Sequence, residues 1–479
     1  MPARCPWHYG YTIAGVATLA KCMTAPGQSI CIGVVIDALI VALPISRTAI
    51  TSLYLVGTTA SACLLPSVGR AVDRWGPRRA IGLAAAGLGG ACMLLASASS
   101  RPVLLLAFFL LRFFGQGSKN LVAQTTINLW WVQRRGTVMS VGRSIMNLAL
   151  LFAFPVAMHR LQAAHGWRNM YRLLGLAELA LMLPLGLLLF RGAPELYGML
   201  PDGRRRAPPV SGEGSEGGRG TPTAAGGADA DAADAADAAD AVGVVDAPDP
   251  AALEHNWTKA QALRTLTFWS IAGGVFTNSL VVTALFFHLH SVLVETGLTT
   301  EAARAPMYLV MAVSTVASTL FVGWLVDRGA RANVLLAVSL GCTGVCCVLF
   351  ALPAWLGQTL SPAVLLLVGA LQGVGGGLSA TTDATTYANY FGRRELGAIT
   401  GVANSLSVLG SAFGPLPFGV VKDATGSYAW AFVGAACMCL VAALAALLRG
   451  GKPGAPPTTT TEGVAIAIKT IAGKEEAVV

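Results

Sequence analysis

Four basic side chains lie within long stretches of apolar and small residues: Lys21, Arg112, Lys119 and Arg143. An ionisable group in such surroundings is costly unless it faces a polar cavity or a partner of opposite charge. Three acidic side chains share these stretches: Asp37, Glu178 and Asp383. Because the cations outnumber the carboxylates, the sequence predicts a surplus of positive charge that a small anionic ligand would neutralise.

The basic residues occur at helical spacing and beside residues that can open a helix. Arg112 and Lys119 are almost two helical turns apart, so both are expected to project from one helix face. Lys21 and Gln28 flank a Pro-Gly pair that can kink the helix toward a cavity. The candidate ligand-binding residues are therefore Lys21, Gln28, Arg112, Lys119 and Arg143. The alternative is that these basic groups pair with the buried carboxylates and hold the helices together, or extend to the surface.

Two further groups are candidates for proton coupling. Asp383 lies among small residues and threonines in GGGLSATTDATT, where it could bind a proton or form hydrogen bonds with its neighbours. His288 lies in ALFFHLHSVL, and histidine is the side chain that titrates near neutrality without assistance. His288 is equally well explained as a residue at the membrane interface.

The composition places these residues in a membrane protein. Hydrophobic residues make up 54% of the 479 residues, charged residues only 12%, and the mean hydropathy is +0.63. A soluble protein needs about a quarter of its residues charged to cover its surface. A membrane-spanning helix needs roughly 20 apolar residues. Twelve segments meet this requirement, near residues 11–41, 48–69, 79–99, 102–127, 137–158, 169–190, 265–290, 305–326, 333–354, 362–388, 397–420 and 428–448.

The basic residues outside these segments indicate the orientation. Most of them fall in segments that share one side of the membrane with the N-terminus, the central loop and the C-terminus. The positive-inside rule therefore places both termini and the central loop in the cytosol. The net charge of +9 is explained by this bias and does not indicate nucleic-acid binding.

A change in composition divides the chain into two halves. Residues 191–264 are rich in Pro, Gly and Ser and contain an Asp-Ala-Ala repeat, which cannot bury enough apolar area to fold. We expect an N-terminal six-helix half over residues 1–190, a disordered cytosolic linker over 191–264, a C-terminal six-helix half over 265–449, and a disordered cytosolic tail over 450–479.

The two halves share a short charged segment. GRAVDRWGPRR begins at Gly69, after the second predicted span, and GWLVDRGARAN begins at Gly323, after the eighth. The matching residues are Gly69, Asp73 and Arg74 in the first segment and Gly323, Asp327 and Arg328 in the second. The recurrence of the same Gly, Asp and Arg residues after the second span of each half indicates a duplicated six-helix unit.

The first segment closely resembles the Gly-x-x-x-Asp-Arg-x-Gly-x-Arg-Arg signature of the major facilitator superfamily. The resemblance covers nearly the whole chain apart from the linker and tail, and it implies an all-α membrane protein of twelve transmembrane helices in two pseudo-repeats. It also implies a conformational latch on the cytosolic side, formed by Gly69, Asp73, Arg74, Gly76, Arg78, Arg79, Asp327 and Arg328. Arg112 in RFFGQG is similar to the fourth-helix arginine of that family, which is associated with proton coupling or substrate contact.

Several phrases resemble the monocarboxylate and oxalate/formate exchanger branch of the superfamily. They are APGQSICIGV, ISRTAITSLYLVGT, LWWVQRRGTVMS, HGWRNMYRLLG and GWLVDRGARAN. The resemblance implies a secondary active transporter of a small organic anion, coupled to protons or to a counter-anion, within a lipid bilayer. A neutral-solute or drug exporter of the same fold, and a membrane sensor that does not transport, are the alternatives.

Enzyme chemistry finds little support in the sequence. The ten cysteines lie mostly in predicted spans without metal-ligand spacing. The glycine-rich GVGGGLS lies inside an apolar span, where it favours helix contact over phosphate binding. We therefore expect no enzymatic activity, no cofactor and no metal.

Overall fold

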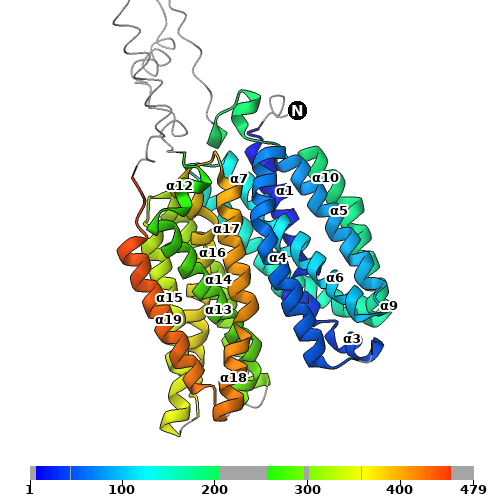
Figure 1. Cartoon of the computed structure of the whole chain (residues 1–479). Helices are drawn as coiled ribbons and strands as arrows, with labels where there is room; N and C mark the ends of the chain where they lie inside the picture. The colour runs from blue at the N-terminus through cyan, green and yellow to red at the C-terminus, as the bar shows by residue number, and fades with distance from the viewer. Residues whose placement is uncertain (1–6, 44, 204–255, 296–300, 358, 455–479) are drawn as a thin grey trace, which may run out of the picture.

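The computed structural model of the chain describes residues 7–43, 45–203, 256–295, 301–357 and 359–454, and these residues form helices and no strand. Two helical bundles lie side by side, one built from the N-terminal half and one from the C-terminal half (Figure 1). Most of the predicted linker, residues 204–255, and most of the predicted tail, residues 455–479, lie outside the described residues.

The N-terminal bundle contains six spans, four of which consist of several helical segments. The first comprises α1 (Gly10–Cys22), η2 (Ala25–Gly27), α2 (Ser29–Gly33) and α3 (Ile36–Ala42). The second is α4 (Arg47–Trp75) and the third is α5 (Pro77–Ala96). The fourth comprises α6 (Arg101–Leu111), the π-helical η3 (Arg112–Lys119) and α7 (Asn120–Trp130). The last two comprise α8 (Arg135–Leu148), η4 (Ala149–Ala153), α9 (Phe154–Ala177), η5 (Glu178–Met182) and α10 (Leu183–Leu189).

The chain turns from the fifth span to the sixth inside α9. Gly166 lies within this helix with a φ of 77°, a left-handed conformation that glycine adopts without a steric penalty. The residues before Gly166 continue the fifth span and those after it begin the sixth. The predicted boundary between these two spans, residues 159–168, therefore forms part of a bent helix.

The C-terminal bundle contains six spans with fewer interruptions. They are α13 (Leu266–Glu295), α14 (Glu301–Asp327), α15 (Ala332–Leu356), α16 (Pro362–Phe391), the pair α17 (Leu396–Phe413) and α18 (Pro415–Thr425), and α19 (Ala429–Arg449). Aromatic residues fill much of its core, including Phe268, Phe391 and Phe432, which are at most 1% exposed.

Nine helices in the described part of the chain are long and apolar enough to cross a membrane. The first, fourth and fifth spans are absent from this set as separate helices. The first is broken near Pro26, the fourth carries Arg112 and Lys119, and the fifth carries Arg143. Counting these interrupted helices gives the twelve transmembrane helices expected from the sequence.

The two bundles touch mainly along two helix pairs, α4 with α17 and α8 with α14. These pairs occupy equivalent positions in the two halves, because α4 and α14 are second in their halves while α8 and α17 begin the fifth. The internal repeat read from the sequence therefore reappears as a repeated interface.

Short folded segments lie at both ends of the predicted linker. On one side are η6 (Pro194–Tyr197) and η7 (Pro201–Gly203), and on the other is α12 (Lys259–Leu263). Asp202 has a φ of 59° and accepts hydrogen bonds from the backbone N–H groups of residues 132–134. Asn256 accepts hydrogen bonds from the backbone of Arg393 and Arg394. We call this end of the molecule, where the chain leaves at Gly203 and returns at Asn256, the linker end (Figure 1).

Candidate functional site

Asp73 joins the two halves at the linker end. Its Oδ1 accepts a hydrogen bond from the Gly397 N–H at 2.9 Å, and its Oδ2 accepts one from the Ala398 N–H at 2.6 Å. These N–H groups belong to the first turn of α17, where they have no partner within the helix. A carboxylate is favoured there because the helix dipole places partial positive charge at that end.

Asp327 makes the equivalent contact from the other half. Its two carboxylate oxygens accept hydrogen bonds from the Gly136 N–H at 2.6 Å and the Thr137 N–H at 2.8 Å. Gly136 lies in the first turn of α8. Each half therefore contributes one aspartate that caps a helix of the opposite half, and the two contacts are related by the internal repeat.

Glycines let these helices approach closely. A Cβ atom added to Gly69 would collide with the backbone of Gly397, and one added to Gly136 would collide with the backbone of Gly323. Any larger residue at these positions would force the halves apart. The glycines therefore let the helices of the two halves touch at the linker end, where the aspartates cap them.

Two of the four arginines of the predicted latch contact their own half in the described structure. Arg78 donates to the Leu187 carbonyl, and Arg328 lies over the Trp324 ring at 3.7 Å. Arg74 and Arg79 are exposed. Gly76 has a φ of 79° and turns the chain from α4 into α5. Among the residues of the predicted latch, Asp73 and Asp327 therefore bond to the opposite half, while Arg78 and Arg328 contact their own.

Asp73→Asn is expected to open the linker end. The asparagine amide carries no charge, so the two charge-assisted hydrogen bonds of Asp73, each worth about 1.5–3 kcal/mol, are weakened or lost. The open population should therefore rise about tenfold or more. Double electron–electron resonance measures this change as the distance between two spin labels. The labels are attached at the exposed positions 75 and 331 through W75C and R331C. Asp423→Asn removes an exposed carboxylate and serves as the control. Identical distance distributions in both variants would contradict the latch.

Three charged side chains approach one another between the halves. Lys21 belongs to α1, Arg143 to α8 and Asp383 to α16, and their charges act on one another. Lys21 is 2% exposed. None of the three forms an ion pair or a hydrogen bond through its side chain within the described residues. This cluster, which we call the central triad, therefore carries two cations and one carboxylate without direct pairing.

The helix that bears Asp383 is fixed against the N-terminal half. Gln124 donates to the Asp383 carbonyl at 3.4 Å, and Asn128 donates to the Ala384 carbonyl at 2.9 Å. Both donors lie on α7. These hydrogen bonds hold the backbone of α16. The Asp383 carboxylate, in contrast, has a buried Oδ1 without a hydrogen-bond partner among the described residues. The carboxylate is therefore available to a ligand or a proton.

Lys119 and Arg112 occupy a different place, at the break in the first span. Lys119 pairs with Glu178 and also donates to the Met23 carbonyl at 3.0 Å. Arg112 donates to the Gly27 carbonyl at 3.3 Å and lies 5.3 Å from the centre of the Tyr54 ring. Both side chains thus reach the first span, as expected from their spacing. Their other partners differ, because Lys119 also pairs with Glu178 and Arg112 lies over Tyr54.

The break explains why two cations are found there. α1 ends at Cys22, and the chain resumes a regular helix only at Ser29. Such a break frees backbone carbonyls, which must find donors because the membrane offers no water. Gln28 stabilises the same turn by donating to the Thr24 hydroxyl at 2.9 Å. Lys119, Arg112 and Gln28 therefore support the first span, and we leave them out of the proposed ligand site.

His288 lies inside the C-terminal half. Its Nδ1 is 3.2 Å from the Tyr428 hydroxyl, its Nε2 is 3.0 Å from the Pro415 carbonyl, and its ring stacks on Phe418. These partners join α13 to α18 and α19. His288 thus bridges helices of one half, away from Asp383 in α16.

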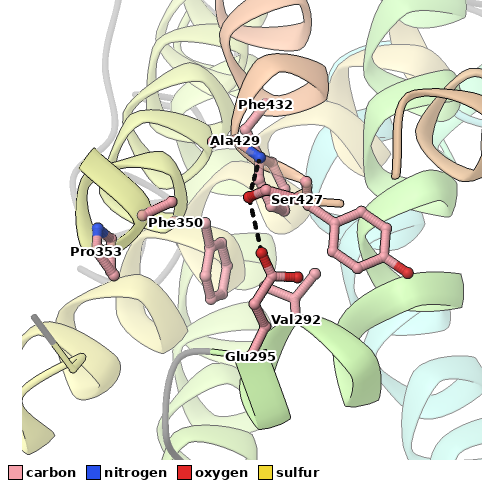
Figure 2. A pocket seen from close by; sticks show the side chains of 9 residues that line it. Val292, Glu295, Phe350, Pro353, Ser427, Ala429 and Phe432 are labelled. Atoms are coloured by element: carbon pink, nitrogen blue, oxygen red, sulfur yellow. Dashed lines mark hydrogen bonds between the residues drawn. The ribbon is translucent and has the colours of Figure 1, made fainter. Parts of the chain in front are cut away.

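Two pockets lie away from the central triad. One of about 80 Å³ lies in the C-terminal half, where Ser427 donates to Glu295 and accepts from the Ala429 N–H (Figure 2). Ligand pockets commonly measure about 300–1,000 Å³, so this one is too small for most metabolites. The other measures about 380 Å³ and lies beside the latch, with Asp73, Glu195 and Arg393 among its lining residues.

The fold, with two six-helix halves, is that of a membrane transporter. A family model described as the Major Facilitator Superfamily matches residues 17–415 and 307–475. The chain belongs to this superfamily. No match was found among curated protein sequences.

Solved structures of the same fold cover almost the entire chain. The human organic anion transporter MFSD10 (TETRAN) is 15% identical, with a TM-score of 0.59, and the alignment covers 92% of this chain and 100% of that one. The proton:xylose symporter XylE, bound to 6-bromo-6-deoxy-D-glucose, is 14% identical with a TM-score of 0.58, and the coverage is 91% and 94%. A double Trp mutant of XylE is 16% identical with a TM-score of 0.63, and the coverage is 95% and 98%. At these identities the similarity establishes the fold.

Proposed function

We propose that this protein is a secondary active transporter of a small organic anion, which binds at the central triad. The observation that carries this proposal is the charge of the triad, in which Lys21 and Arg143 lie within electrostatic range of the single carboxylate of Asp383. An excess of one positive charge between the two halves favours an anion there over a neutral solute. A carboxylate group could accept hydrogen bonds from both cations.

The choice of an anion rests on the site and not on the fold. The superfamily fold supports secondary transport by alternating access. The solved structures of this fold include both an organic anion transporter and a sugar symporter, so the architecture alone does not select a substrate. The phrases that resemble the monocarboxylate branch, such as LWWVQRRGTVMS, add support for a monocarboxylate.

The latch provides the conformational part of the mechanism. With Asp73 and Asp327 capping α17 and α8, the linker end is closed, and the positive-inside rule assigns that end to the cytosol. Binding of an anion reduces the repulsion between Lys21 and Arg143, which lets the halves rock about the triad. Release of both aspartates then opens the cytosolic side.

Uptake into proteoliposomes tests this function. The purified protein is reconstituted and given radiolabelled acetate, L-lactate, oxalate, D-xylose and alanine in separate experiments. The proposal predicts saturable uptake of one or more of the carboxylates. Saturable uptake of xylose alone would instead favour a neutral-solute carrier, and no uptake of any probe would favour a membrane sensor.

Asp383→Asn is expected to remove proton coupling. Asp383 is the carboxylate of the triad, and asparagine cannot bind a proton. Uptake of L-lactate driven by an acidic exterior should fall to the level measured without a pH gradient, while lactate–lactate exchange should persist. Asp423→Asn is the control, since this exposed carboxylate lies outside the triad. A full response of D383N to the gradient would exclude Asp383 as the coupling group.

A further inference from the structure

The end of α1 requires a hydrogen-bond donor from another helix. The Thr24 N–H and hydroxyl both donate to the Lys21 carbonyl, so the last turn of α1 closes on itself. The Met23 carbonyl, one residue past the end of the helix, instead accepts from the Lys119 ammonium at 3.0 Å. Met23 is partly buried, and a carbonyl inside the membrane that loses its donor is destabilised, so Lys119 fixes the direction in which the chain leaves α1.

Glu178 fixes Lys119 in turn. The two side chains are fully buried and form an ion pair that joins the fourth and sixth spans. A lysine side chain has many rotamers, and a buried ammonium needs an anionic partner to remain in one of them. The second carboxylate oxygen of Glu178 is buried without a hydrogen-bond partner in the described part of the chain. Glu178, Lys119 and the Met23 carbonyl are therefore connected in series, with Lys119 in contact with both of the others.

Lys21 lies two residues before Met23, in the last turn of the same helix. We propose that Glu178 and Lys119 are positioning residues, which hold the break in the first span and thereby orient the Lys21 ammonium toward Arg143 and Asp383, the other two members of the central triad. The part of this inference that concerns ligand binding rests on the proposed function. The part that concerns the break does not, because the contacts exist without a ligand.

Chemical labelling of cysteines measures the break directly. Cys22 adjoins Lys21 and Met23 and is 8% exposed, whereas Cys346 is fully buried in α15 of the other half. N-ethylmaleimide is added to the full-length protein, and peptide mass spectrometry gives the labelling rate of each thiol. Labelling of Cys346 reports global unfolding, so the ratio of the two rates isolates the local change.

The main variant is K119M/E178Q, which removes the donor to Met23 and leaves neither member of the pair charged. We expect the ratio of Cys22 to Cys346 labelling to rise about tenfold, in proportion to the loss of one charge-assisted hydrogen bond. Lys119→Arg keeps a charged donor and is expected to keep the ratio near that of the wild type. If K119M/E178Q does not fold, Glu178→Asp shortens the carboxylate by one methylene and gives the same readout.

An unchanged ratio in the folded variants would overturn the inference. A parallel rise in the labelling of Cys22 and Cys346 would also overturn it, because the pair would then serve only general stability. L-lactate uptake by the same proteoliposomes gives the second readout, in which the apparent KM should rise about tenfold with little change in the maximal rate. If the wild type transports no lactate, the proposed substrate fails while the Cys22 ratio still decides the positioning role.

Discussion

Lys119→Met is expected to destabilise the protein by about 3–5 kcal/mol, because it leaves the Glu178 carboxylate buried without its partner. The lost hydrogen bond to the Met23 carbonyl adds to this effect. The apparent midpoint of thermal unfolding, followed by intrinsic fluorescence in detergent, should fall clearly below that of the wild type. This is the largest stability change that we expect from a single substitution in the N-terminal half.

The double variant K119M/E178Q separates burial of charge from loss of packing. It is expected to recover most of the stability, because neither buried charge remains. Arg160 is exposed and has no ion-pair or hydrogen-bond partner among the described residues, so Arg160→Gln should leave the midpoint unchanged. A K119M midpoint equal to that of the wild type would show that Glu178 does not need Lys119.

Lys21→Gln and Arg143→Gln are each expected to lower anion uptake roughly a hundredfold, since truncating one member of a desolvated charge pair costs about 2–5 kcal/mol. Each substitution balances the triad at one cation and one carboxylate and so removes the surplus charge. Initial rates of L-lactate uptake over a range of concentrations measure the effect as a change in Vmax/KM.

Arg112→Gln provides the informative comparison for these two variants. Arg112 donates a hydrogen bond to the Gly27 carbonyl and lies outside the triad. Its replacement is therefore expected to lower the unfolding midpoint and to leave the selectivity between lactate and neutral solutes unchanged. If K21Q and R143Q transport lactate as well as the wild type does, the triad does not bind the anion and the neutral-solute carrier is favoured.

The architecture could be predicted from the sequence because it depends on local patterns. A span is recognised from its own apolar residues, and the repeat is recognised from two short segments that contain Asp73 and Asp327. Both aspartates do cap helices of the opposite half, which follows from the repeat once two six-helix units are placed face to face. The family is likewise confirmed by a match over most of the chain.

The pairing of charges could not be predicted from the sequence. Lys119 and Glu178 lie in different spans, and nothing in the spacing of either span identifies the other as its partner. The fourth span also widens into a π-helix from Arg112 to Lys119, which changes where the side chains point relative to an ordinary helix. The central triad likewise requires Lys21 and Asp383, from opposite halves, to come within electrostatic range of each other.

Two contacts at the linker end also lacked a sequence signal. Asp202 and Asn256 lie within the segment predicted as a disordered linker, yet they cap the loops that precede α8 and α17. Short polar residues are common in loops, and their partners become visible only in three dimensions. The folded ends of the linker therefore support the same two helices that the latch aspartates cap from the opposite half.

The central claim is that the surplus positive charge of the triad binds an anion. Ligand-induced thermal stabilisation of the purified protein tests it most directly, because a ligand that binds only the folded state raises the unfolding midpoint. We predict that one or more of acetate, L-lactate and oxalate raise the midpoint of the wild type in a concentration-dependent manner, and that the same compound has no effect on K21Q. Stabilisation by D-xylose to an equal extent in the wild type and K21Q, with no response to any carboxylate, would contradict the claim.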